Sequence, residues 1–490
     1  FLEVGVSSYL ENTVYHVPET GWTLVTPWIV TSRNGLFEAT ASGGKGFHDR
    51  FITPESGIYF IALNLHMANT TAGFLKASLV INGEFEEANG FEVKDPPSGL
   101  TGNSGLSAGQ SFSSGPSSLI VSGVVKLDKG DAVTVYIQSD TNDNEMVDGL
   151  FCISVVSYDW PGVTATLTES IIINSPGWTK IAPWKTYGAS GLFSFDNAFF
   201  SANGVYRPHQ EGTYFVSCNV IFNGGGKGNL SAVIAIDDVV DTGNGLYSLN
   251  ENPKRVVTLN VAGSIRLTKS QNVSIYVKTT VSSSWNVAKE TGFSVVLVGA
   301  DSLSTTGFFA VKQEEASQSS SCGEIDRWRA IQPVVDSFIN NSAQFNSTSG
   351  RFKAKEDGLY LTSANILIHH SGLSRISMTI VLDGPPSKIA ATTFQPIPSN
   401  SPSGNFVSTL TLASTLRLVA DQYLSIFIEV QCQSVAPWKV LANSSFSVVL
   451  VSRWESDYNA GFLANNIATE KDNSGFNKIN YWVQLFSKKL

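Results

Sequence analysis

The chain is poor in cysteine, in charge and in long apolar runs. Its four cysteines in 490 residues show no Cys-x-x-Cys spacing, so a structural zinc site is not expected. The longest apolar runs, such as residues 293–298, are the size of a strand and far shorter than the roughly 20 residues of a membrane-spanning helix. The net charge of −9 argues against nucleic acid or an anionic membrane as the main partner.

Constellations of catalytic residues are also missing from the sequence. There are no paired carboxylates, no Cys/His dyad and no phosphate loop with Walker spacing, so we predict a protein that is not an enzyme and needs no cofactor. The run from Gly105 through Ser107 to Gly109 fits Gly-x-Ser-x-Gly, but that motif needs a strand-to-helix turn and here lies in a Gly/Ser-rich segment. His369 and His370 are adjacent in a predicted strand, so they point to opposite faces and cannot bind one metal ion.

One pattern recurs three times along the chain: an aromatic residue, a short spacer and then Gly-x-Tyr. The three glycines are Gly57, Gly212 and Gly358, with spacings of 155 and 146 residues. A period of this length is that of a domain, so the chain is predicted to be a tandem array of one module. A Gly-Trp-Thr site (loosely matched by Arg-Trp-Arg in the third copy), a tight turn of Asn-Gly, Asp-Asp or Asp-Gly and a closing apolar strand that begins with Phe recur in the same order.

The local pattern is that of strands throughout. Apolar residues alternate with polar ones between short Gly, Asn, Asp, Ser and Pro segments, which predicts an all-β chain of tandem β-sandwiches. The predicted units are residues 1–160, 161–299, 300–457 and 458–490. The last is expected to be the start of a fourth module, because Gly461 and Trp482 each lie 154 residues after Gly307 and Trp328.

The ordered set of motifs resembles the C1q/tumour-necrosis-factor-like jelly-roll family. The matching segments are Gly57-Ile-Tyr59-Phe60, Asn82-Gly83, Lys129-Gly130-Asp131, Phe151, Gly212-Thr-Tyr214-Phe215, Phe293-Ser294, Gly358-Leu-Tyr360, Asp383-Gly384 and Phe446-Ser447. The resemblance implies that modules pack in threes, with Tyr59, Tyr214 and Tyr360 at the trimer axis. An alternative is that these tyrosines are core residues whose hydroxyls are hydrogen-bonded. Three linked modules can form a pseudo-trimer within one chain, or each module can trimerise with its equals in other chains.

Secretion is the predicted destination. The evidence is a set of six Asn-x-Ser/Thr sequons, at Asn69, Asn229, Asn272, Asn340, Asn346 and Asn443. The chain begins at Phe1, which we interpret as a processed product or a window from a longer chain. Cys322 and Cys432 both lie in the third repeat and form a candidate disulfide, whereas Cys152 and Cys218 lie in apolar strand patterns and are predicted to be buried thiols.

One segment offers oxygen ligands at a spacing that suits calcium. Asp140, Asn142 and Asn144 alternate in the first module, but neither the glycine nor the distant glutamate of a calcium loop follows. We keep them as a candidate calcium site, with a solvated acidic turn as the alternative.

Taken together, these features predict a secreted, non-enzymatic protein that works through its surfaces. The first hypothesis is an extracellular structural or adhesive polymer, a filament that self-assembles through trimer-type packing of its modules. The second is a soluble C1q-like recognition protein, a lectin or innate-immune binder whose loops contact glycans or microbial surfaces. The expected partners are therefore other copies of itself and, in the second case, glycans.

Overall fold

A computed structural model shows a chain built almost entirely of antiparallel strands. The residues that it describes are 5–10, 15–17, 22–25, 28–30, 36–38, 50–69, 73–82, 106–112, 115–141, 144–157, 161–186, 193–194, 198–224, 228–244, 246–251, 256–280, 285–300, 307–312, 315–318, 322–324, 328–330, 344–370, 373–383, 389–396, 406–432, 438–453, 464–466, 470–471, 477–478 and 482–484. Among them, no helix has the length and apolarity that crossing a membrane requires.

The first module is a sandwich of two sheets. One has the order β10-β7-β12-β1-β4, with β2 paired to β12, and the other has the order β5-β6-β11-β8-β9, with β3 paired to β11. The strands are β1 (Gly5–Leu10), β2 (Tyr15–Val17), β3 (Trp22–Leu24), β4 (Trp28–Val30), β5 (Leu36–Glu38), β6 (Arg50–Ile52), β7 (Gly57–Asn69), β8 (Gly73–Ile81), β9 (Ser107–Phe112), β10 (Gly115–Leu127), β11 (Ala132–Ser139) and β12 (Asn144–Ser157).

The second module repeats this plan. Strand β20 pairs with β23, β25 and β26 in one sheet, and the opposite sheet has the order β18-β19-β24-β21-β22. The elements are β13 (Gly162–Leu167), β14 (Ile171–Ile172), β15 (Thr179–Lys180), β16 (Trp184–Lys185), β17 (Phe193–Ser194), β18 (Phe199–Phe200), β19 (Val205–Tyr206), β20 (Gly212–Gly224), β21 (Asn229–Ile236), the 3-10 turn η1 (Thr242–Asn244), β22 (Tyr247–Glu251), β23 (Val256–Leu267), β24 (Val273–Thr279), β25 (Trp285–Val287) and β26 (Gly292–Ala300).

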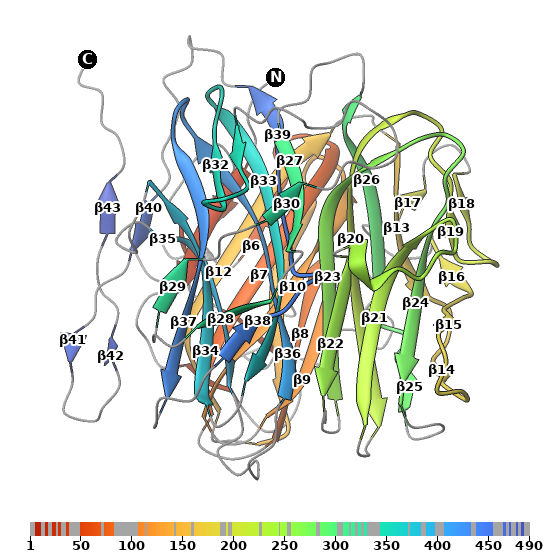
Figure 1. Cartoon of the computed structure of the whole chain (residues 1–490), viewed down its shortest axis with the longest axis horizontal. Helices are drawn as coiled ribbons and strands as arrows, with labels where there is room; N and C mark the ends of the chain where they lie inside the picture. The colour runs from red at the N-terminus through yellow and green to blue at the C-terminus, as the bar shows by residue number, and fades with distance from the viewer. Residues whose placement is uncertain are drawn as a thin grey trace.

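The outer sheet of the second module continues into the third module, because β22 pairs with β36 at Asn250 and Ser408. From there the order is β36-β33-β39-β27-β30, and the other sheet of the third module has the order β31-β32-β37-β34-β35. The strands of the third module are β27 (Gly307–Lys312), β28 (Ala316–Gln318), β29 (Cys322–Glu324), β30 (Trp328–Ala330), β31 (Phe345–Asn346), β32 (Arg351–Lys353), β33 (Gly358–His370), β34 (Leu373–Leu382), β35 (Ile389–Pro396), β36 (Phe406–Leu418), β37 (Tyr423–Cys432), β38 (Trp438–Val440) and β39 (Ser445–Arg453). Figure 1 shows these teal and blue strands on one side, the green strands of the second module on the other, and the orange strands of the first between and behind them.

Connectivity identifies each sandwich as a jelly roll. In the first module the chain runs from β7 in one sheet to the hairpin β8-β9 in the other, back to β10, across to β11 and back to β12. The second module follows the same path through β20, β21-β22, β23, β24 and β26, and the third through β33, β34-β35, β36, β37 and β39. Repeated crossing between two antiparallel sheets is the jelly-roll arrangement. The predicted fold class is thus what the structure has.

The same turn residue recurs after the second strand of this path in each module. Asn82, Asp237 and Asp383 have φ of 54°, 55° and 53°, the left-handed region that Asn and Asp tolerate best after Gly. Each also accepts, through its side-chain oxygen, a backbone N–H at the start of the partner strand, at 2.9, 2.8 and 2.9 Å respectively. The predicted tight turns therefore also fix the register of the strand that follows.

Each module has an apolar core of its own between its two sheets. The long central strands β20 and β33 are buried at nearly every position, so both of their faces are covered. Beyond the third module, the structure describes two short strand pairs, β40 (Ala464–Asn466) with β43 (Trp482–Gln484), and β41 (Glu470–Lys471) with β42 (Asn477–Lys478). Most of the tail lies outside the described residues, so the fourth copy stays a prediction.

Candidate functional site

A cluster of apolar side chains joins all three modules. It comprises Ile58, Phe60, Ala62, Val124, Cys152, Val156, Phe193, Phe215, Ala262, Val296, Val298, Leu361, Ala413 and Val449, and all of them are buried. We call this set the inter-module cluster. Inside it the rings of Phe60 and Phe215 meet edge to face, with centroids 5.3 Å apart and planes at 89°. Such aromatic pairs contribute about 0.5–1.5 kcal/mol beyond the burial of their surface.

The repeated tyrosines do not belong to this cluster. Tyr59, Tyr214 and Tyr360 each lie in the core of their own module and are fully buried. Their hydroxyls donate to the backbone carbonyls of Glu55 at 2.7 Å, Gln210 at 2.6 Å and Glu356 at 2.8 Å. Burial raises the pKa of Tyr360 to about 12. The prediction of an axial tyrosine is therefore wrong, and these residues have the core role with a satisfied hydroxyl.

The residue after each tyrosine makes the inter-module contact instead. Phe60, Phe215 and Leu361 all belong to the inter-module cluster. Successive side chains of a strand point to opposite faces, so a tyrosine that faces the core places its neighbour on the outer face. The Gly-x-Tyr motif therefore marks the strand that contacts the other modules. The alternation of side chains along that strand determines which of its two faces makes the contact.

The three modules pack in a closed cycle. Strand β9 of the first module packs against β23 of the second, β22 of the second against β36 of the third, and β35 of the third against β10 of the first. These are equivalent strands in each jelly roll, so each module contributes one surface to the next module and another to the previous one. A head-to-tail contact that closes after three members forms a ring.

Side chains of the second module also hydrogen-bond the edge strand of the first module. Strand β10 is the edge of its sheet, and one side of its backbone faces the second module. The N–H of Val124 donates to Ser294 Oγ at 3.2 Å, and its carbonyl accepts from Thr164 Oγ1. Asn219 Nδ2 donates to the carbonyl of Ser122 at 2.8 Å. An exposed edge strand is a template for unwanted pairing, and here the next module satisfies it.

The edge strand β23 of the second module is met by the third module in the same way. Asn365 accepts from the N–H of Ala262 at 3.3 Å through Oδ1 and donates to the same residue's carbonyl at 2.6 Å through Nδ2. The N–H of Ser264 donates to Ser447 Oγ at 3.1 Å. One amide side chain thus satisfies both backbone groups of a neighbour's residue.

The contact between the third and first modules closes the cycle. Thr415 Oγ1 lies 2.7 Å from Cys152 Sγ and 2.8 Å from Ser154 Oγ. Cys152 occupies the strand position that Ser294 and Ser447 occupy in the other two modules, as their registers with β7, β20 and β33 show. We call this third-to-first contact the seam. Cys152 and Cys218 are buried free thiols, as predicted, and burial raises the pKa of each.

The asparagines at these contacts were missed by our reading of the sequence. Asn64, Asn219 and Asn365 each lie five residues after the repeated tyrosine, and all three are buried. The sequence did contain a signal for them: an asparagine recurs at the same position of an otherwise largely apolar strand in each module. Buried polar groups need partners, so three such asparagines at one position indicate a shared contact that a single module cannot supply.

We expect replacement of Asn365 by alanine to loosen the contact between the second and third modules. The change removes the partner of both backbone groups of Ala262, at a cost of about 1–3 kcal/mol for the buried groups left unpaired. The measurement is amide hydrogen exchange at Ala262 and along β23, which should accelerate. Thr362→Ala is the matched control on the same strand, because the hydroxyl of Thr362 bonds Ser414 within the third module at 3.0 Å. Equal acceleration of β23 in both variants would contradict this assignment.

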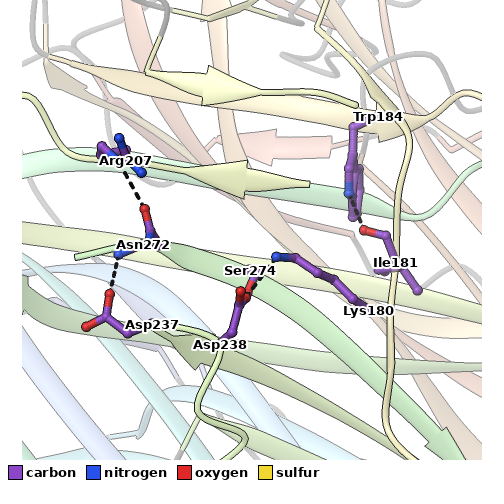
Figure 2. Close-up of polar contacts among 8 residues, drawn as sticks. All are labelled: Lys180, Ile181, Trp184, Arg207, Asp237, Asp238, Asn272 and Ser274. Carbon is purple, nitrogen blue, oxygen red and sulfur yellow. Dashed lines mark hydrogen bonds and ion pairs between the residues drawn. The ribbon is translucent and has the colours of Figure 1, made fainter. Parts of the chain in front are cut away.

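Figure 2 shows three separate groups of polar contacts in the second module. Asp237 Oδ1 accepts from the N–H of Asn272 at 2.8 Å, and Asn272 Oδ1 accepts from Arg207 Nε at 3.0 Å. Trp184 Nε1 donates to the carbonyl of Ile181 at 2.8 Å. The sequon residue Asn272 is therefore held in the structure of the turn through its backbone and its side-chain oxygen.

Asp238 follows in the same turn, where the first and third modules have glycine. Its φ is 58°, a region that a non-glycine residue occupies at a cost. Asp238 Oδ1 accepts from Lys180 Nζ at 2.8 Å and from Ser274 Oγ at 2.7 Å. The bond from Lys180 is the main cause that lowers the pKa of the Asp238 carboxyl. These two hydrogen bonds hold Asp238 in its turn, and both partners of its carboxylate oxygen lie within the second module.

The other sequons differ in exposure. Asn346 is exposed, and its Oδ1 accepts from the N–H groups of Thr348 and Ser349, both at 3.0 Å. Asn229 and Asn443 are half-buried. Asn340 and the side chain of Asn69 lie outside the described residues. Use of any of these sequons stays a prediction.

The candidate calcium site is described only in part. Asp140 Oδ1 accepts from the N–H of Phe74 at 2.6 Å, so one of its oxygens joins two strands of the first module. Asn142 and the side chain of Asn144 lie outside the described residues. Within the described part of the chain, no group of three or more His, Cys, Asp or Glu side chains is placed to hold a metal ion.

The candidate disulfide falls on two paired strands. Strand β29 pairs with β37 so that Cys322 lies opposite Glu429, and Cys432 ends β37. The side chains of Cys322 and Cys432 are outside the described part of the chain, so their pairing stays a prediction.

Comparison with known proteins gives structural likeness only. No protein-family model matches the chain, and no curated protein matches it. The structure of Eiger TNF from S. frugiperda is 13% identical, with 32% of this chain and 98% of that chain covered and a TM-score of 0.25. The structure of murine APRIL at pH 5.0 is 11% identical, with 30% of this chain and 98% of that chain covered and a TM-score of 0.22. The jelly-roll assignment rests on the strand connectivity described above.

Proposed function

We propose that this chain is a secreted, non-enzymatic recognition protein whose three jelly-roll modules fold into one head. The observation that carries the proposal is the closed cycle of contacts around the inter-module cluster. These contacts bury, within one chain, the strand faces through which separate modules would otherwise self-assemble. The outer sheets and the loops are then the surfaces left for a partner. This favours the hypothesis of a discrete binder over that of an open polymer.

The outer sheet of the second module is the surface that we expect to meet a ligand. Three cation–aromatic pairs lie on it: Lys180 over Tyr276 at 5.9 Å, Lys278 over Trp178 at 5.8 Å, and Arg207 over the exposed ring of Phe200 at 5.4 Å. Trp178 also contacts Tyr247 edge to face, with centroids 6.3 Å apart. Aromatic rings with polar neighbours combine apolar contact with hydrogen bonding. A glycan is the class of partner that this chemistry suits.

The expected result in solution is a particle with the mass of one chain, 52.7 kDa. Light scattering coupled to size-exclusion chromatography, repeated over a hundredfold range of concentration, measures it. A glycan array with the same material then tests recognition, and Trp178→Ala is the variant expected to reduce retention. A large, concentration-dependent assembly in freshly secreted protein would reject this proposal and favour the polymer.

A further inference from the structure

The seam differs from the other two contacts in how the chain connects it. Between the first and second modules, β12 ends at Ser157 and β13 begins at Gly162; between the second and third, β26 ends at Ala300 and β27 begins at Gly307. Both connections are short, so each holds its two modules together. Cys152 and Thr415, which meet at the seam, are 263 residues apart, and no direct link joins their modules.

The seam includes hydrogen bonds between side chains of the two modules: Thr415 Oγ1 lies within hydrogen-bonding distance of both Cys152 Sγ and Ser154 Oγ. Strand β35 also lies against β10, and β36 against β12. The seam therefore consists of two complementary surfaces held by packing rather than by the chain.

We propose that the seam is an exchangeable interface whose partner is a second copy of this chain. The third module of one chain docks on the first module of another through the contacts that close the cycle within one chain. No new surface is needed, but the contact between the second and third modules must open together with the seam, because while it holds, the third module lies on the first module of its own chain. Two chains that exchange reciprocally form a swapped dimer, and a succession of such exchanges forms an open polymer. The inference rests on the closed head of the proposed function and adds a route from it to larger assemblies.

Short connections determine when exchange occurs. They keep the third module near the first at an effective concentration on the order of 1 mM. At 10 µM chain, about one seam in a hundred is then expected between chains, and at 500 µM about one in three. The fraction of seams between chains therefore rises about thirtyfold over this range, once the chains have opened and closed again.

The native Cys152 provides a direct readout through one substitution, Thr415→Cys. The two side-chain atoms are 2.7 Å apart across the seam, so paired thiols there fall within reach of a disulfide. Chains with and without nitrogen-15 are mixed, unfolded under reducing conditions, refolded at 10 and 500 µM, and oxidised. Mass spectrometry then counts cross-linked 152–415 peptides with one label or with both. The variant Thr415→Cys with Cys152→Ser is the matched control, because it keeps the new thiol and removes its partner.

The expected result is mixed-label 152–415 peptides whose share rises about thirtyfold between the two concentrations. Peptides with a single label at both concentrations would overturn the exchange and leave the closed head intact. Absence of the 152–415 cross-link at both concentrations would overturn the seam and, with it, the proposed head. A second measurement needs no substitution: native mass spectrometry of the refolded, mixed-label wild-type chain should show mixed dimers at 500 µM, and their absence there also overturns the inference.

Discussion

Replacing Phe215 by alanine is expected to destabilise all three modules together. Phe215 is fully buried in the inter-module cluster and contacts Phe60 of the first module. Truncation of a buried phenylalanine costs about 3–5 kcal/mol, because the lost burial is joined by the cost of a cavity. Here the cavity opens between modules, so the free energy that couples their unfolding falls. Amide exchange should accelerate in β7 of the first module as well as in β20.

The matched control lies on the same strand. Phe222 is also fully buried in β20, but it lies in the core cluster of the second module, which Phe309 and Val311 of the third module join, and not in the inter-module cluster. Phe222→Ala should therefore cost a similar free energy while amide exchange in β7 of the first module changes little. If Phe215→Ala leaves exchange in the first module at its wild-type rate, the inter-module cluster does not couple the modules.

Stability is expected to fall in mild acid because of one histidine. His370 is buried at the end of β33, with Nε2 3.2 Å from Ser408 Oγ. Burial, and secondarily the charge of His369, lowers the pKa of His370 to about 4 from an ordinary value of 6.5. The unfolded chain therefore takes up this proton at a higher pH than the folded chain. Stability is greatest above about pH 6.5, falls as the pH drops below that value and levels off below about pH 4, with a total loss of about 3 kcal/mol.

Urea unfolding of the wild type and of His370→Gln at pH 7 and at pH 4.5 measures this effect. The glutamine variant should lose less free energy of unfolding between the two pH values than the wild type does. The control is His369→Gln, since His369 is only half-buried on the opposite face of the same strand and its variant should keep most of the wild-type pH dependence. A pH dependence that persists undiminished in His370→Gln would assign it to other groups.

The fold could be predicted because its signals are local. Alternating apolar residues define strands, and the turns at Asn82, Asp237 and Asp383 need residues that tolerate positive φ. The recurrence of Gly-x-Tyr gives the module count, because a tyrosine whose hydroxyl returns to a carbonyl four residues earlier is a property of a single chain segment. Each of these features depends on neighbours in the sequence.

The inter-module site could be predicted only in outline. The resemblance pointed to the correct strand but to the wrong face of it, because Tyr59 and Phe60 are both large aromatic residues and the position of the core decides which of them faces inward. Asn219 and Asn365 carried a signal that becomes interpretable only when a neighbouring edge strand is present to be bonded. Cys152 gave no sequence signal for its position at the seam.

The sequence by itself determined that this protein is a series of β modules with tight turns and tyrosine-anchored central strands. Periodicity and turn chemistry suffice for that, since they act over a few residues. Only the tertiary structure decided that the three modules pack against one another within one chain, that Phe60, Phe215 and Leu361 meet there, and that Thr415 closes the cycle on Cys152. These contacts join residues more than a hundred positions apart, and their free energy depends on the complementarity of whole surfaces, which no local pattern records.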